Sequence, residues 1–231
     1  MESSGRRRAV TGTRLICFIR FIRLTVTLIL GSLLLFNTGC LPGDGGGYLL
    51  EDTFEDEGSG WGCDRRDEFA RGYAAGEYFF ELNHPDWMTW AVAGRSFDDV
   101  SIQVEARLAS GSTDGHWGVL CRYADEGNFY YFAISTDGYY GIFRRVDGGE
   151  LEPLTADGLG MLPSPVIKTG EETNTITATC QGNRLSLVVN GEELTTVTDD
   201  TLQRGDVGLA AGSGPTGKTN VRFDYFTAVH P

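Results

Sequence analysis

The sequence has few of the residues that define several protein classes: 231 residues include only seven prolines, five cysteines and three histidines. Few prolines and a hydrophobic content of 41% exclude an intrinsically disordered chain. The 32 glycines follow no collagen-like repeat, and five cysteines are too few for a small disulfide knot. A folded globular chain is the class that remains.

Basic residues are also scarce beyond the N-terminal region. Residues 1–39 contain six arginines and one glutamate, a net charge of +5, whereas residues 40–231 contain 13 basic and 31 acidic residues, a net charge of −18. A body this acidic repels phosphate backbones and anionic lipid head groups, so nucleic acid is not expected as a partner. Neutral or cationic ligands are expected instead.

The first forty residues resemble a secretion signal. Arginines precede an apolar segment whose cleanest part is Leu24–Phe36, which as a helix is about 20 Å long and shorter than the ~30 Å core of a bilayer. Residues 37–40 (NTGC) resemble a bacterial lipobox, in which Cys40 is lipidated and becomes the first residue.

We therefore expect a lipoprotein signal peptide at residues 1–40 and a Gly-rich tether at residues 41–47. The alternative is an uncleaved N-terminal transmembrane anchor over Leu15–Phe36, long enough to span a membrane. Both interpretations place the rest of the chain outside the cytoplasm.

From residue 48 onward the hydrophobic pattern is that of β-strands. No stretch of twelve residues has helical spacing, and apolar residues alternate with polar ones at 101–108, 117–123, 175–180 and 185–189. Asp-Gly and Asn-Gly dipeptides at 137–138 and 190–191 suit tight hairpin turns. The pattern predicts an all-β domain of two antiparallel sheets packed face to face, each with one solvated side.

Several of these segments resemble the concanavalin A-like lectin/glucanase superfamily: residues 118–123 (GVLCRY), 128–135 (NFYYFAIS), 137–140 (DGYY), 183–191 (NRLSLVVNG), 205–209 (GDVGL) and 223–226 (FDYF). Within it they most resemble the laminin-G-like and 3-keto-disaccharide hydrolase-like jelly rolls of bacterial lipoproteins. The resemblance implies a two-sheet antiparallel jelly-roll sandwich over residues 48–231. It implies little about chemistry, because one fold hosts many functions.

Three cysteines remain for the folded body once Cys17 is assigned to the signal and Cys40 to lipidation: Cys63, Cys121 and Cys180. Three thiols in an oxidising compartment allow three pairings. Cys121 and Cys180 both fall on the apolar side of their strands, so both should point into the sandwich. A Cys121–Cys180 disulfide is expected, the alternative being two small buried thiols.

Residues 212–219 (GSGPTGKT) match the phosphate-loop pattern in full. That loop binds phosphate because a helix follows it and directs its N-terminal amides at the anion. Here residues 221–226 alternate like a strand. We expect a Gly-rich hairpin loop and no nucleotide.

Catalytic motifs are scarce. Glucanases of the resembled superfamily use two acids on alternate residues of one strand, and no such run is present. The motifs HExxH and GxSxG are absent as well. His84 and His116 are expected in loops, where either can donate to a ligand. We expect no catalytic residues, and activity like that of the 3-keto-disaccharide hydrolases is the alternative.

A structural calcium ion is the only cofactor that the resemblance suggests. Jelly rolls of this type can hold one near their paired termini through carboxylate and carbonyl oxygens. Asp52 and Asp224 are the candidate ligands if the first and last strands pair. The absence of a DxDxDG loop favours the alternative, in which such an Asp only hydrogen-bonds a turn.

The expected binding site is a solvated face of one sheet, where aromatic rings can cover the C–H side of a sugar and Arg can donate to its hydroxyls. If Tyr130, Phe132 and Ile134 point inward, Tyr131 points outward, and a slip of one residue would reverse this. Cross-strand aromatic pairing that only stabilises the sheet is the alternative. The expected ligand-binding residues are Arg122, Tyr131, Tyr139 and Phe143, with Trp87 and Trp90 as a rim in a loop-rich segment.

The sequence thus predicts a surface-tethered lipoprotein whose non-catalytic domain binds a neutral glycan. Two alternatives stay open: a glycoside-active enzyme, and a sensory or adhesive module with a protein partner.

Overall fold

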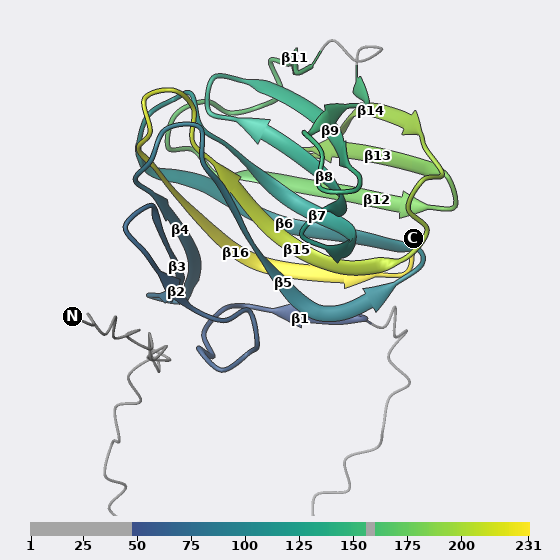
Figure 1. Ribbon diagram of the computed structural model, residues 1–231, viewed down its shortest axis with the longest axis horizontal. Helices are drawn as coiled ribbons and strands as arrows, with labels where there is room; N and C mark the ends of the chain where they lie inside the picture. Colours follow the sequence, from purple (N-terminus) through teal and green to yellow (C-terminus); the bar gives the residue numbers. More distant parts are fainter. Residues whose placement is uncertain (1–47, 156–159) are drawn as a thin grey trace, which may run out of the picture. The chain divides into compact units, whose positions relative to one another are not determined.

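A computed structural model of the chain describes residues 48–155 and 160–231 (Figure 1). The signal peptide, Cys40 and the tether expected at residues 1–47 lie outside this part. The described residues form 16 strands in two antiparallel sheets. They contain no helix with the length and hydrophobicity needed to cross a bilayer.

The larger sheet has nine strands in the order β14-β13-β12-β6-β16-β4-β3-β2, and β1 also pairs with β16. The first and last strands therefore lie side by side, as expected. The strands of this sheet are β1 (Leu50–Asp52), β2 (Asp64–Arg65), β3 (Phe69–Ala74), β4 (Glu77–Leu82), β6 (Val100–Gly111), β12 (Asn174–Gln181), β13 (Arg184–Val189), β14 (Glu192–Thr198) and β16 (Thr219–Val229).

The smaller sheet has seven strands in the order β10-β9-β8-β7-β15-β5, and β11 also pairs with β9. Its strands are β5 (Met88–Phe97), β7 (His116–Asp125), β8 (Asn128–Ser135), β9 (Tyr139–Arg145), β10 (Glu152–Pro153), β11 (Leu162–Pro163) and β15 (Gly205–Gly212). Strands distant in sequence are neighbours in both sheets, as in a jelly roll, and the predicted fold class is confirmed.

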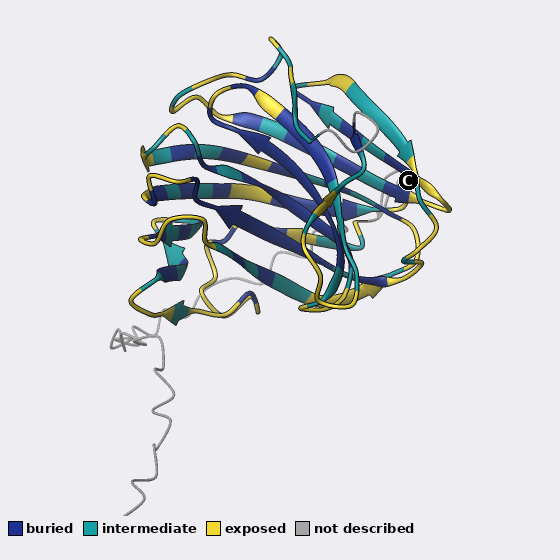
Figure 2. Cartoon of the chain, turned by 45° about the horizontal axis from the view of Figure 1, so that its top comes forward, coloured by how far each residue is buried: buried dark blue, intermediate teal, exposed yellow. Residues whose placement is uncertain are grey.

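The main core lies between the sheets, where the alternating strands direct their apolar side chains (Figure 2). On β6, Ile102, Val104 and Ala106 are buried while the residues between them are partly or fully exposed. Each fully buried Val, Leu, Ile or Phe side chain contributes roughly 1.5–3 kcal/mol to folding. The alternation of apolar and polar residues along each strand therefore determines which side chains form the core.

The structure contains the expected disulfide and one of the expected tight turns. Cys121 on β7 and Cys180 on β12 form a disulfide, so the expected bridge ties one sheet to the other. Asn190 and Gly191 both have positive φ angles, 52° and 84°, in the turn that joins β13 to β14. Asn and Gly accept this conformation at low cost, which is why the dipeptide marks a tight hairpin.

The loop after Gly212 differs from the expectation. It joins β15 to β16, and these strands belong to different sheets, so the loop is a crossover and not a hairpin. A strand follows it, as expected, where a phosphate loop has a helix. A local sequence pattern cannot distinguish a hairpin loop from a crossover loop. The difference lies in whether β15 and β16 pair with each other or with other strands.

Candidate functional site

The outer side of the seven-stranded sheet carries a second apolar cluster, separate from the core. We call it the aromatic face and define it by Trp90, Tyr123, Phe129, Tyr131 and Phe143. The inward side of β8 holds Tyr130, Phe132 and Ile134, so the expected strand orientation is confirmed. The expectation of a polar outer side is wrong for this sheet, because β8 is buried on both faces.

Three of the aromatic side chains pack against one another across the sheet, with Phe129 fully buried between the other two. The ring centroid of Phe129 lies 5.5 Å from Trp90 and 5.9 Å from Tyr123, with the Phe129 and Tyr123 rings stacked. The indole Nε1 of Trp90 donates a hydrogen bond to the hydroxyl of Tyr123, 3.3 Å away. Trp90 lies on β5, not in a loop as expected, and both it and Tyr123 remain partly exposed.

Tyr131 points to the expected side but is fully buried there. Its ring lies 6.1 Å from that of Phe143, and its hydroxyl is 2.9 Å from Nδ1 of His116. Burial raises the pKa of Tyr131 well above 10 and lowers the pKa of His116 to about 4. Both side chains are therefore uncharged near neutral pH.

Arg122 does not lie on the aromatic face, in contrast to the expectation. A β-bulge between Cys121 and Asp125 gives Arg122 a φ of 52° and reverses the alternation of β7. The guanidinium turns inward and is only 1% exposed, and it donates hydrogen bonds to the carbonyl oxygens of Asp98 and Leu202. Tyr123, assigned inward from the sequence, takes the outward position instead.

The remaining expected binding residues stay near the surface. Tyr139 and Phe143 share one side of β9, with Tyr139 39% exposed and Phe143 partly buried against the aromatic face. Trp87 is 36% exposed just before β5, where its amide donates to Oγ of Ser213. Tyr123 was not among the expected binding residues, because the bulge is not visible in the sequence. His116, expected in a loop, begins β7.

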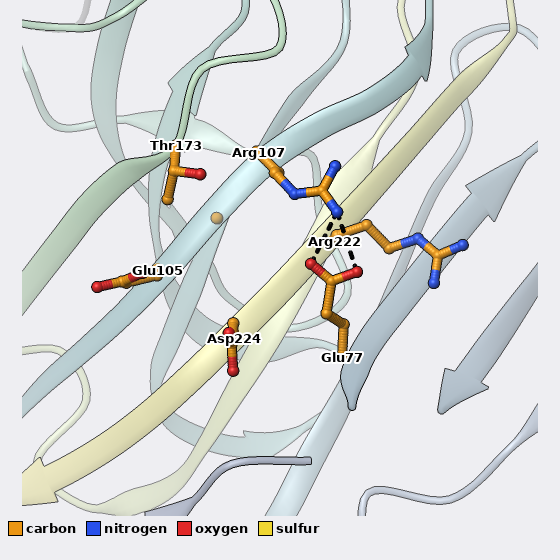
Figure 3. A pocket seen from close by; sticks show the side chains of 7 residues that line it. Glu77, Glu105, Arg107, Thr173, Arg222 and Asp224 are labelled. Atoms are coloured by element: carbon orange, nitrogen blue, oxygen red, sulfur yellow. Dashed lines mark hydrogen bonds and ion pairs between the residues drawn. The ribbon is translucent and has the colours of Figure 1, made fainter. Parts of the chain in front are cut away.

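A charged hollow of about 170 Å³ lies on the outer side of the nine-stranded sheet (Figure 3). Arg107 forms an ion pair with Glu77 at 2.8 Å, whereas Arg222 lies over the ring of Phe79, 5.1 Å from its centroid. Glu105 stands directly opposite another carboxylate, since it is the register partner of Asp224. The residues that line the hollow are Glu77, Glu105, Ala106, Arg107, Thr173, Arg222 and Asp224.

The two candidate calcium ligands, Asp52 and Asp224, each accept hydrogen bonds from nearby groups of the chain. The carboxylate of Asp52 is buried and accepts hydrogen bonds from the amide of Phe54 and the indole Nε1 of Trp61. Asp224 is exposed and accepts from the amide of Tyr225. No group of three or more potential metal ligands occurs in residues 48–155 and 160–231. Each carboxylate thus accepts a hydrogen bond from a backbone amide one or two residues further along the chain.

The chemistry of the aromatic face follows from its outward positions on β5, β15, β7, β8 and β9. Around the aromatic rings these positions hold no Asp or Glu: Met88, Trp90 and Val92 on β5, Gly208, Ala210 and Gly212 on β15, His116, Gly118 and Leu120 on β7, Phe129, Tyr131 and Ala133 on β8, and Tyr139, Gly141 and Phe143 on β9. Asp206, the register partner of Tyr123, lies on the same side of β15 as Gly208 and places a carboxylate at the edge of the face. Such a surface suits the apolar side of a neutral ligand.

Solved structures with this fold resemble the chain at low sequence identity. A Bacillus subtilis protein of unknown function with a galectin-like fold is 8% identical, with a TM-score of 0.58 over 79% of this chain and 96% of that one. A Bacteroides ovatus mixed linkage glucan GH16 protein, in complex with a G4G4G3G product, is 9% identical, with a TM-score of 0.57 over 78% and 100%.

The carbohydrate-binding module CBM66 from Bacillus subtilis is 14% identical, with a TM-score of 0.50 over 74% of this chain and 92% of that one. At these identities the likeness establishes the fold alone, and that fold is the two-sheet sandwich that the resemblance implied. No protein-family model matches the chain, and no curated protein matches its sequence.

Proposed function

We propose that the domain binds a neutral glycan on the aromatic face and does not cleave it. The observation that carries the proposal is the pair of partly exposed rings of Trp90 and Tyr123, which pack on the buried ring of Phe129. Flat aromatic rings pack against the C–H side of sugar rings, and Trp90 and Tyr123 keep polar atoms at the edge of the surface.

The same positions support a binding role over hydrolysis. Glycoside hydrolysis usually needs two carboxyl groups that flank the scissile bond. Asp206 faces outward on β15, and the outward positions named above give it no second Asp or Glu as a partner. The carbohydrate-binding module and the GH16 protein that share the fold add support for a glycan as the ligand class. The proposed neutral glycan also agrees with the net charge of −18 over residues 40–231.

An array of neutral glycans probed with the full chain tests the proposal. We expect binding to at least one glycan, and its loss in Trp90→Ala and in Phe143→Ala. Phe79→Ala is the matched control, because Phe79 is a partly buried aromatic on the other sheet. Thermal unfolding of each variant separates lost binding from lost fold. Absence of binding across the array, or equal binding by all three variants, would overturn the proposal.

We also propose that the domain is held at the cell surface through lipidated Cys40. The support is the sequence alone: a basic start, a short apolar core and the NTGC segment. In cells that express the chain, Cys40→Ser is expected to release the protein from the membrane fraction. A Cys40→Ser chain that stays in that fraction at the wild-type size would favour the uncleaved anchor.

A further inference from the structure

The aromatic face contains one imidazole, and its surroundings define how it can act. His116 begins β7 and is partly exposed, whereas Tyr131, its partner on β8, is fully buried. The hydroxyl of Tyr131 and Nδ1 of His116 are 2.9 Å apart, and neither atom has another partner in residues 48–155 and 160–231.

The buried phenol fixes the tautomer of the imidazole. Tyr131 keeps its proton because burial raises its pKa well above 10. A buried O–H group without an acceptor is costly, so the hydroxyl of Tyr131 donates its proton to Nδ1. In a neutral imidazole the proton then resides on Nε2, which becomes a hydrogen-bond donor.

The neighbouring strand holds the ring in place. A methyl group on Gly212 of β15 would collide with Cε1 and Nε2 of His116, so the edge of the imidazole occupies the space that a side chain would fill. Some polar side-chain atoms of residues 48–155 and 160–231 are completely covered and have no hydrogen-bond partner. Nε2 of His116 is not one of them. The donor is therefore held in place, and its nitrogen is not completely covered by the chain.

We infer that His116 is the specificity-determining residue of the aromatic face: Nε2–H donates to a hydroxyl oxygen of the bound sugar, and Tyr131 is the positioning residue that fixes this donor. The inference rests on the proposed glycan-binding function and deepens it. The rings supply contact area that any sugar with an apolar side can use, whereas one directed donor distinguishes sugars by where an acceptor oxygen stands.

The first test needs no ligand. Nitrogen-15 spectra of the histidine-labelled full chain at pH 7 report which imidazole nitrogen carries the proton, and His116→Gln assigns the signal. We expect protonated Nε2 in the wild type and a mixture of tautomers in Tyr131→Phe. A proton on Nδ1 in the wild type would overturn the inference.

The second test uses three neutral probes, cellohexaose, xylohexaose and mannohexaose, measured by titration calorimetry. For the probe that binds, His116→Ala is expected to weaken affinity by about tenfold, the usual effect of one lost hydrogen bond. Gly212→Ala, which displaces the ring, is expected to act in the same direction. His230→Ala, a histidine at the end of β16 in the other sheet, is the control.

Monodeoxy derivatives of the bound sugar complete the design. One deoxy position should weaken binding to the wild type and leave His116→Ala unaffected, because the donor and its acceptor form a coupled pair. Wild-type binding with unchanged affinity in His116→Ala would overturn the inference and leave the proposed function standing. Failure of the wild type to bind any neutral glycan would overturn both.

Discussion

The guanidinium of Arg122 donates a hydrogen bond through Nη1 to the main-chain carbonyl of Leu202, 2.9 Å away. Its Nε donates to the carbonyl of Asp98 at 3.0 Å, and Nη2 lies 3.2 Å from Oδ1 of Asp99. One side chain at the bulge of β7 thereby holds the loop between β5 and β6 and the loop between β14 and β15. Arg122, which the sequence placed on a binding surface, is thus a buried residue that links two loops of the sandwich.

Arg122→Ala is expected to lower the free energy of unfolding by about 3 kcal/mol, because it removes a buried side chain and leaves two partly buried carbonyl groups without their donor. Urea-induced unfolding measures the change. Arg204→Ala is the control, since its ion pair with Asp98 is exposed and should contribute under about 0.5 kcal/mol. Equal effects of the two substitutions would contradict the structural role of Arg122.

The Cys121–Cys180 disulfide closes a loop between residues 59 apart in sequence. The chain-entropy relation gives a contribution of about 4 kcal/mol for a loop of this length. The double variant Cys121→Ala, Cys180→Ala should therefore unfold at a much lower urea concentration than the wild type. Alanine is preferred to serine because both positions are buried and a hydroxyl there would need a partner. A loss below about 1 kcal/mol would contradict the prediction.

The burial of His116 should make stability depend on pH. Its pKa is about 4 in the folded chain and ordinarily 6.5, so the unfolded state binds more protons between these values. Stability is therefore full above about pH 6.5 and falls by up to about 3 kcal/mol as the pH is lowered to about 4. The difference between wild type and His116→Gln, measured at pH 7.5 and 4.5, isolates this contribution. A wild-type slope no steeper than that of the variant would refute it.

The directly opposed carboxylates of Glu105 and Asp224 should repel each other. Glu105→Gln is expected to raise the free energy of unfolding by roughly 0.2–1 kcal/mol, and by more at low salt, because like charges opposite each other destabilise a strand pair. Glu171→Gln is the control, since it removes the same charge from an exposed residue outside the hollow. If Glu105→Gln and Glu171→Gln are equally stable, any gain in stability comes from the lower net negative charge of the chain. Repulsion between Glu105 and Asp224 would then not explain it.

Much of the fold could be predicted from the sequence because the causes are local. The alternation of β8 placed Tyr130 inward and Tyr131 outward, and the Asn190–Gly191 dipeptide marked a tight turn. Cys121 and Cys180 both fall on the apolar side of their alternating strands, and this indicated the disulfide between them. Each of these features depends on the side chains of one strand or of one turn.

The tertiary structure decided the candidate site, because its causes are contacts between strands distant in sequence. The bulge of β7 forms where that strand pairs with β8 and β15, and this register turns Arg122 inward and Tyr123 outward. Tyr131 is buried because the neighbouring strands of the same sheet present large side chains around it. The sequence by itself determined which residues of the regularly alternating strands face the core, because that alternation is local. The packing of strands decided the orientation at the bulge of β7 and which outward residues stay exposed.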